Sequence, residues 1–414
     1  MTIVELYDEK TINNIVGTLA FNPDKVIYVG GYSKKQFESK KMPVLQSYYK
    51  CKGFSALDLE YIQVKRESLI DIISKLEEIY SQNEDCKFHV EITGGEDLIL
   101  IGLGVLCQRH PEIELYQISS KLRTIRSFSI GNDDGTKLDI TCQNTVEENL
   151  QLHGASIISA NGSNELSKGF LWDIEFLHDV DIMWNICCKG VNDLPTASAP
   201  NLWNKVAMTL SRLDEENEHR EEANIISVTE SHFKDKNVII VFKNDQVRLC
   251  LNKAGLILEL KTYIVCSGLV GFRDGDCMTG VTIDWDGEED ISSSVKYLYN
   301  PNDPDSTIDT TNEIDVLANC GLVPYFISCK NGKFSSEELY KLFSVGERFG
   351  KGYSKKIVVT TNMSYALGGA KNVVLQRAAD MGIAIIEDVH KMTNEQFSKA
   401  LSKAMELPKV KATQ

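Results

Sequence analysis

The residues best suited to chemistry lie in two short runs of the C-terminal half. They read NEID at residues 312–315 and ISCK at residues 327–330. If both runs are strands, side chains alternate between faces, so Glu313 and Asp315 share one face and Ser328 and Lys330 share one face. A hairpin turn between the runs would bring two carboxylates, a hydroxyl and an ammonium group into one patch.

A patch of this kind suits the hydrolysis of a phosphodiester. Carboxylates hold Mg²⁺ or Mn²⁺, the metal generates hydroxide, and a lysine offsets the negative charge that develops on the phosphoryl group. Three more residues can join the patch: Glu259 in the helical pattern LELKTY, and Glu338 with Lys341, one helical turn apart. The alternative is two amphipathic strands with a solvent face, a surface carboxylate and an ordinary i,i+3 ion pair.

Elements that could position a ligand site come first in the chain. Short β-rich runs alternate with helical patterns, which predicts a mostly parallel, doubly wound sheet that binds ligands outside the carboxyl ends of its strands. A capping box, TVEE at 145–148, and then Gly154 end this domain. The expected elements are strands at Ile3–Leu6, Lys25–Gly30, Ala56–Val64, Phe88–Ile92 and Glu114–Ile118, with the clearest helix at Ser68–Tyr80.

The rest of the chain predicts a partly helical connecting region over 155–225 and a mixed α/β domain over 226–414. In the second domain the order is helix, three strands, helix, strand. The expected elements are a hairpin of Val238–Phe242 and Val247–Leu251 around Asn244, helices at Ala254–Ser267, Ser336–Glu347, Lys371–Met381 and from Asn394, and strands at Met278–Trp285, Glu313–Ala318, Val323–Cys329, Lys356–Thr360 and Ile383–Ile386.

This order of motifs resembles the restriction-endonuclease-like PD-(D/E)xK domain, more narrowly the one in CRISPR ancillary nucleases that carry a CARF sensor. The resemblance spans about 255–390 and rests on LELKTY, GVTIDWDG, NEIDVL, ISCK and ELYKL. It implies that Asp315 binds metal and Lys330 is catalytic, with Glu313 and Glu259 as auxiliary carboxylates and metal ligands. The chain departs from the motif at Ser328, where the motif has an acid.

The first domain resembles a CARF domain over residues 1–152. The segment FHVEITGGED at 88–97 predicts a strand that runs into Thr-Gly-Gly and then a helix, where backbone N–H groups can approach a phosphate. In the CARF family the loops after the first and fourth strands bind a cyclic oligoadenylate across a dimer interface. The resemblance therefore assigns ligand binding to Tyr7, Asp8, Lys10 and Thr11 in one loop, and to Thr93, Gly94, Gly95, Glu96 and Asp97 in the other.

Composition narrows the class of protein. The net charge of −15 argues against constitutive coating of nucleic acid, which needs local Lys and Arg. Eleven cysteines without a CxxC argue against a disulfide framework or a zinc ribbon, so a reducing, cytoplasmic location is expected. No stretch reaches the ~18 apolar residues of a membrane span, and the N-terminus lacks the layout of a signal peptide.

Together these features predict an N-terminal Rossmann-like CARF domain (1–154) and a C-terminal restriction-endonuclease-like mixed α/β domain. We expect a cytoplasmic homodimer, without membrane contact, acting in type III CRISPR antiviral defence. Cyclic tetra-adenylate would activate it to cut single-stranded RNA or DNA, or to nick DNA, with Mn²⁺ or Mg²⁺. The main alternative is a signal-binding module with an inactive nuclease-like domain. A nucleotide-dependent oxidoreductase is disfavoured, because no G-x-G-x-x-G follows the first strand.

Overall fold

The chain folds into two units, each with its own sheet. Unit 1 comprises Met1–Ala155 and Arg348–Tyr353, and unit 2 comprises Ser156–Glu347 and Ser354–Gln414. The computed structural model describes residues 1–407 except for 84–87, 120–123, 130–134, 163–168, 191–225, 230–238, 253–254, 270, 274, 286–310, 332–335 and 362–370.

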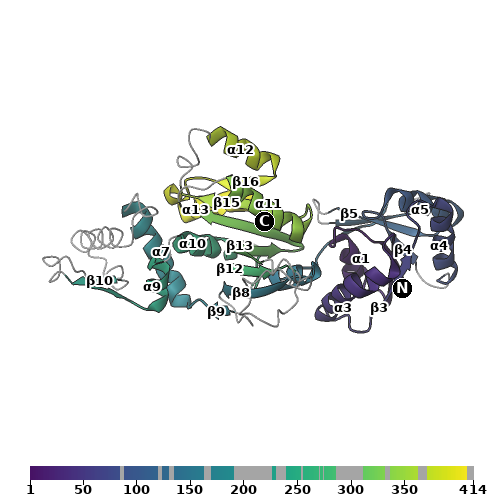
Figure 1. The fold of residues 1–414 in the computed structure, drawn as a ribbon, viewed down its shortest axis with the longest axis horizontal. Coiled ribbons are helices and arrows are strands. Elements are labelled where there is room, and N and C mark those ends of the chain that lie inside the picture. Colours follow the sequence, from purple (N-terminus) through teal and green to yellow (C-terminus); the bar gives the residue numbers. More distant parts are fainter. Residues whose placement is uncertain are drawn as a thin grey trace, which may run out of the picture. The chain divides into compact units, whose positions relative to one another are not determined.

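Unit 1 is built on a seven-stranded sheet in the order β3-β2-β1-β4-β5-β6-β7. Figure 1 labels β3, β4 and β5 of this sheet. The first five strands are parallel and the last two are antiparallel. The strands are β1 (Thr2–Leu6), β2 (Lys25–Gly30), β3 (Asp58–Gln63), β4 (Phe88–Glu91), β5 (Glu114–Ser119), β6 (Thr124–Phe128) and β7 (Lys137–Asp139). The helices are α1 (Asn13–Phe21), α2 (Lys34–Gln36), η1 (Phe37–Lys41), α3 (Met42–Cys51), α4 (Leu69–Ser81), α5 (Asp97–Arg109) and α6 (Val146–Leu152).

The predicted parallel sheet of unit 1 is confirmed. All five strands expected in this part form, and α4 and α5 pack against each other and fill one apolar core with β1, β2 and β4. The predicted capping box is present at α6, where the Thr145 hydroxyl accepts from Glu148 N and the Glu148 carboxylate accepts from Thr145 N. Because β1 and β4 are adjacent and parallel, the loops that follow them lie at the same edge of the sheet.

Unit 2 contains a second seven-stranded sheet, in the order β16-β15-β14-β13-β12-β8-β9. The predicted order of helix, three strands, helix and strand is confirmed as α10, β12, β13, β14, α11 and β15. The strands are β8 (Ser156–Gly162), β9 (Gly169–Leu171), β10 (Ile226–Thr229), β11 (Ile239–Phe242), β12 (Cys277–Asp284), β13 (Thr311–Cys320), β14 (Val323–Lys330), β15 (Lys355–Thr360) and β16 (Ile383–Ile386). The helices are α7 (Ile174–Gly190), α9 (Asp245–Asn252), α10 (Leu256–Ser267), α11 (Ser336–Gly350), α12 (Lys371–Asp380), η4 (Val389–Lys391) and α13 (Asn394–Ala404).

The predicted hairpin around Asn244 is wrong. Strand β11 pairs with β10 instead, and the expected second arm is helix α9. The Asn244 side chain accepts a hydrogen bond from Val247 N at 2.9 Å, so this residue caps a helix and does not form a turn between strands. In the region expected as a connector, β8 and β9 join the second sheet and α7 follows them; residues 191–225 lie outside the described residues.

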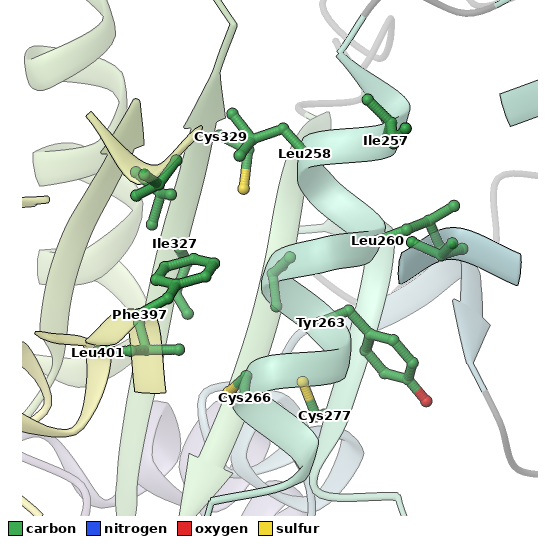
Figure 2. Close-up of a cluster of buried hydrophobic side chains, with 14 of the residues drawn as sticks. Ile257, Leu258, Leu260, Tyr263, Cys266, Cys277, Ile327, Cys329, Phe397 and Leu401 are labelled. Atoms are coloured by element: carbon green, nitrogen blue, oxygen red, sulfur yellow. The ribbon is translucent and has the colours of Figure 1, made fainter. Parts of the chain in front are cut away.

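One face of the second sheet is covered by α10 and α13. Ile327 and Cys329 of β14 point toward these helices, where Figure 2 shows them near Leu258 and Phe397. Because side chains alternate along a strand, Ser328 and Lys330 point to the other face. None of the helices that the structure describes is long and apolar enough to cross a membrane.

Candidate functional site

Asp315, Ser328 and Lys330 meet on the sheet face away from α10. The Ser328 hydroxyl donates to Asp315 Oδ2 at 3.1 Å, the backbone N–H of Cys329 donates to the same oxygen at 2.6 Å, and Lys330 Nζ lies 3.7 Å from it. The hairpin that brings them together turns at Gly321, which has φ +66°. All three contacts go to Oδ2, so Oδ1 of Asp315 accepts none of them.

Helix α11 adds a second carboxylate to this cluster from its first turn. Glu338 Oε2 lies 3.2 Å from Lys330 Nζ, and Glu338 Oε1 lies 3.5 Å from Lys341 Nζ. Burial favours the neutral form of Lys330, but the charges of Asp315 and Glu338 outweigh it and raise the pKa of this lysine. Burial acts on Glu338 in the same way, and Lys330 outweighs it and lowers the pKa of this carboxyl. Lys330 is therefore a cation held between two carboxylates, and Lys341 reaches the cluster only through Glu338.

Two further predicted carboxylates come from other positions in unit 2. The β13–β14 ladder ends at the pair Val316–Ile327, so the exposed Glu313 lies beyond that ladder, at a position where β13 still pairs with Thr282 of β12. Glu259 is buried in the first turn of α10, the helix on the opposite face of the sheet. Burial, together with the charges of Asp315 and Glu259, raises the pKa of the Cys329 thiol, which places both carboxylates around that strand end.

The donor set suits a hard cation that keeps most of its water. Within the described residues, no three His, Cys, Asp or Glu side chains are close enough to form a dedicated metal cage. Mg²⁺ does not require one, because it is commonly held by one or two carboxylates together with water and substrate phosphate. Oδ1 of Asp315 is the oxygen best placed for this role, because the contacts from Ser328, Cys329 and Lys330 all go to Oδ2.

The two loops expected to bind a ligand in unit 1 touch each other. A Cβ added to Gly94 would lie 2.9 Å from Asp8 Cβ and 3.1 Å from the Leu6 carbonyl oxygen. A Cβ on Gly95, which has φ +90°, would lie 2.6 Å from Leu6 Cβ. Both positions therefore require glycine, because any side chain would push the loop after β4 away from the loop after β1.

The loop after β1 is held by hydrogen bonds at Asp8. Its carboxylate accepts from Lys10 N at 3.0 Å and from Asn13 Nδ2 at 2.8 Å, and its backbone exchanges two bonds with the Asn14 amide at 2.7 and 2.8 Å. The Tyr353 hydroxyl donates to Asn13 Oδ1. Lys351 lies 3.5 Å from Glu9 in the same loop. Two residues that follow α11 therefore brace this loop within unit 1.

The remaining predicted ligand residues differ in their burial and in their contacts. Tyr7 is buried in an aromatic cluster, with its ring edge against Phe37, and supports the loop from beneath. Thr11 Oγ1 lies 3.4 Å from His153 Nδ1, and burial followed by the nearby cation Arg348 lowers the pKa of this histidine to about 3. Asp97 is the first residue of α5.

The acidic side chain in the glycine-rich loop has a partner that the sequence did not reveal. Arg66 Nε lies 2.8 Å from Glu96 Oε1, and its guanidinium stacks over the Tyr32 ring at 5.2 Å from the centroid. This pair offsets the negative charge that would oppose an anionic ligand at the start of α5. The loop after β3, which carries Arg66, had given no signal at the sequence level beyond its position at the carboxyl edge of the sheet.

Glu91 is the second residue that sequence reasoning missed. Its carboxylate accepts hydrogen bonds from the backbone N–H groups of Thr93 and Gly94, the latter at 3.0 Å. The Thr93 hydroxyl in turn accepts from Ile118 N at 2.6 Å, which ties the loop to β5. The amides of Thr93 and Gly94 are thus engaged within the protein.

Comparison with known proteins supports the fold and not the sequence family. No family model matches the chain, and no curated protein matches it in sequence. Among solved structures it is similar to Can2 from Sulfobacillus thermosulfidooxidans in complex with cyclic tetra-adenylate, with 16% identity, a TM-score of 0.65, and 98% of this chain and 99% of that chain covered. It is also similar to protein VC1899 from Vibrio cholerae, with 14% identity, a TM-score of 0.68, and 98% and 97% covered.

The likeness extends over nearly the whole length of all three chains. It confirms the predicted fold class: a CARF-like unit with a largely parallel sheet and a nuclease-like unit with a mixed sheet. At 14–16% identity the likeness shows the fold alone. At these identities the roles of individual residues have to be argued from the geometry of this chain.

Proposed function

We propose that this protein is a metal-dependent nuclease of type III CRISPR defence that is activated by a cyclic oligoadenylate. The activator that we favour is cyclic tetra-adenylate. The observation that carries this proposal is the cluster of Asp315, Ser328 and Lys330 on one sheet face, in the order of a PD-(D/E)xK motif. The similarity to Can2, whose structure contains cyclic tetra-adenylate, supports the choice of activator.

Each residue of the cluster has a separate role in this proposal. A divalent cation, when bound at Asp315 Oδ1, would supply hydroxide and polarise the scissile phosphate. The Ser328 hydroxyl and the Cys329 amide hold Oδ2 of Asp315, so they fix the direction in which Oδ1 points. The motif's acid position is thus occupied by a residue that orients the metal ligand.

Lys330 acts as a fixed positive charge. Because its pKa is raised, it stays protonated at neutral pH and does not serve as a general base. Its position between Asp315 and Glu338 lets it stabilise the charge that develops on the phosphoryl oxygens. Glu338 and Lys341 keep the ammonium group in place, and the exposed Glu313 lies at the rim where a nucleic acid strand would pass.

The activator would bind where the loops after β1 and β4 meet. Lys10, Thr11 and the loop Gly95–Asp97 offer cationic, hydroxyl and amide groups at the carboxyl edge of the sheet. A ring ligand with twofold symmetry suits a site formed by two identical subunits, so we propose a homodimer. Exposed apolar residues support this: Ile70 is 83% exposed on α4 and Ile101 is 55% exposed on the neighbouring α5.

Helix α11 offers a covalent route from activator to nuclease. Its first turn carries Glu338, which pairs with Lys330 in unit 2, whereas residues 348–353 at its end belong to unit 1. There, Tyr353 braces the loop after β1 through Asn13. A ligand that prefers one state of this loop would shift the population of α11 positions and so of the catalytic cluster.

The decisive experiment is cleavage of labelled single-stranded RNA, single-stranded DNA and supercoiled DNA with Mn²⁺ or Mg²⁺, with and without cyclic tetra-adenylate. We expect activator-dependent cutting that a chelator abolishes. Asp315→Asn should remove cutting and leave activator binding intact, and Asp380→Asn on the surface of α12 serves as the matched control. Undiminished cutting by Asp315→Asn would refute the site.

A signal-binding module with an inactive nuclease-like unit is the second candidate. Ser328 in place of an acid and the lack of a three-ligand group among the described residues favour it. It predicts tight binding of cyclic tetra-adenylate without cleavage of any substrate, and no uptake of Mn²⁺ that depends on Asp315. The same experiment, with calorimetric titration of Mn²⁺, separates the two candidates.

A further inference from the structure

Glu91 lies at the end of β4, directly beneath the glycine-rich loop. Its two carboxylate oxygens each take one backbone amide, Oε1 from Thr93 and Oε2 from Gly94. A carboxylate that accepts two N–H groups in this way defines a tight turn, because both amides must point to the same side. The next residue, Gly95, has φ +90°, so the chain reverses immediately after the second bond.

This turn allows the loop after β4 to approach the loop after β1. With Gly94 bound to Glu91, its Cα faces Asp8 so closely that an added Cβ would lie 2.9 Å from Asp8 Cβ. The Glu91 side chain therefore determines the position of the glycine-rich loop.

We infer that Glu91 is a positioning residue for activator binding: its ionised carboxylate holds the glycine-rich loop in the shape that receives a cyclic oligoadenylate phosphate. This inference rests on the proposed activator. Glu91 does not touch the ligand, and it acts through the backbone of Thr93 and Gly94.

The surroundings make this carboxylate sensitive to pH. Burial raises the pKa of Glu91 to about 7, although hydrogen bonding by the Thr93 side chain and by the amides of Gly94 and Thr93 acts in the opposite direction. The groups that face it are Glu5 from β1, Asp8 from the following loop and Tyr116 from β5, whose hydroxyl donates to Glu5 at 2.8 Å. Burial and the neighbouring Glu91 raise the pKa of Glu5 well above its usual value.

The direction in which pH changes activator affinity follows from the proposed role of the ionised Glu91 carboxylate. A protonated Glu91 is a poorer acceptor, so the loop loosens and affinity for the activator falls as pH drops through about 7. Folding stability changes in the opposite direction: because the folded-state pKa is raised, the stabilising contribution is greatest at low pH and is lost as pH rises through about 7. A neutral side chain at this position should therefore not lower thermal stability at alkaline pH.

The test measures binding of cyclic tetra-adenylate by calorimetry to the full chain, its Glu91→Gln variant and a Glu60→Gln control on β3. At about pH 8.5 we expect Glu91→Gln to weaken binding by about tenfold or more, since Gln cannot accept from both amides. At about pH 5.5, where wild-type Glu91 is protonated, the two proteins should agree within about twofold. Thermal unfolding at about pH 8.5 checks that the variant folds.

A ratio of affinities that is near one at both pH values, or that stays constant with pH, would overturn the inference. So would wild-type affinity that rises on acidification, a result that needs no variant. If the wild-type chain binds no cyclic tetra-adenylate at either pH, the proposed activator fails instead. The Glu60→Gln protein should follow the wild-type profile throughout.

Discussion

Replacing Lys330 by Met tests the proposed chemistry most directly. The substitution keeps the length of the side chain and removes its charge, so Asp315 and Glu338 lose the cation between them. With the observed separations of 3.7 and 3.2 Å, the two attractions amount to about 4 and about 5 kcal/mol at an effective dielectric constant of about 20.

Most of this attraction is offset when the charges leave water. The net loss of stability should be about 1–3 kcal/mol. The Lys330 side chain is 26% exposed, so solvent screens part of the attraction and burial preserves the rest. The effect on cleavage should be larger, since the cation acts on charge that is greatest in the transition state. Removing one such group from other enzymes lowers the rate by about 10²–10³-fold, and the same range is expected here.

The assay is the initial rate of activator-dependent cleavage at saturating activator, together with thermal unfolding and activator affinity. Glu338→Gln is the matched comparison, because it leaves Lys330 paired with Asp315 and should cost less than Lys330→Met. If Lys330→Met cuts within about threefold of the wild type, the cation does not stabilise the transition state and the proposed role is refuted.

Two further predictions concern the route from activator to nuclease and the dimer. Tyr353→Phe removes the hydrogen bond to Asn13, so the activator concentration for half-maximal cleavage should rise about fivefold, a shift not expected for Tyr340→Phe on the exposed side of α11. Ile101→Lys should turn the dimer into monomers in sedimentation experiments, while Leu138→Lys on β7 should not; a dimer that persists in Ile101→Lys places the interface elsewhere.

Much of the fold could be read from local patterns. Every strand expected in the first domain forms within about two residues of its predicted bounds. Near Asn244 the prediction failed because Asn suits both a hairpin turn and a helix N-cap, and a short apolar run such as Val247–Leu251 does not distinguish a strand from one face of a helix. The pairing of β11 with β10 is a long-range choice that no window of sequence contains.

The candidate site, like the fold, could be predicted from the sequence only in part. Alternation along two strands was enough to expect Asp315, Ser328 and Lys330 on a common face, and the structure brings these three together. Alternation did not reveal that the β13–β14 ladder ends before Glu313, nor that Glu259 approaches from the opposite face. Those facts depend on where strands diverge and on which face a helix packs.

The sequence by itself determined the features that depend on neighbours in the chain, namely the period of the strands and the helix cap at Thr145. Only the tertiary structure decided which distant groups meet. The pairing of Arg66 with Glu96 and the bond from Tyr353 to Asn13 join residues far apart in the chain. Such contacts arise from packing, because a buried or crowded polar group takes whichever partner the fold places within reach.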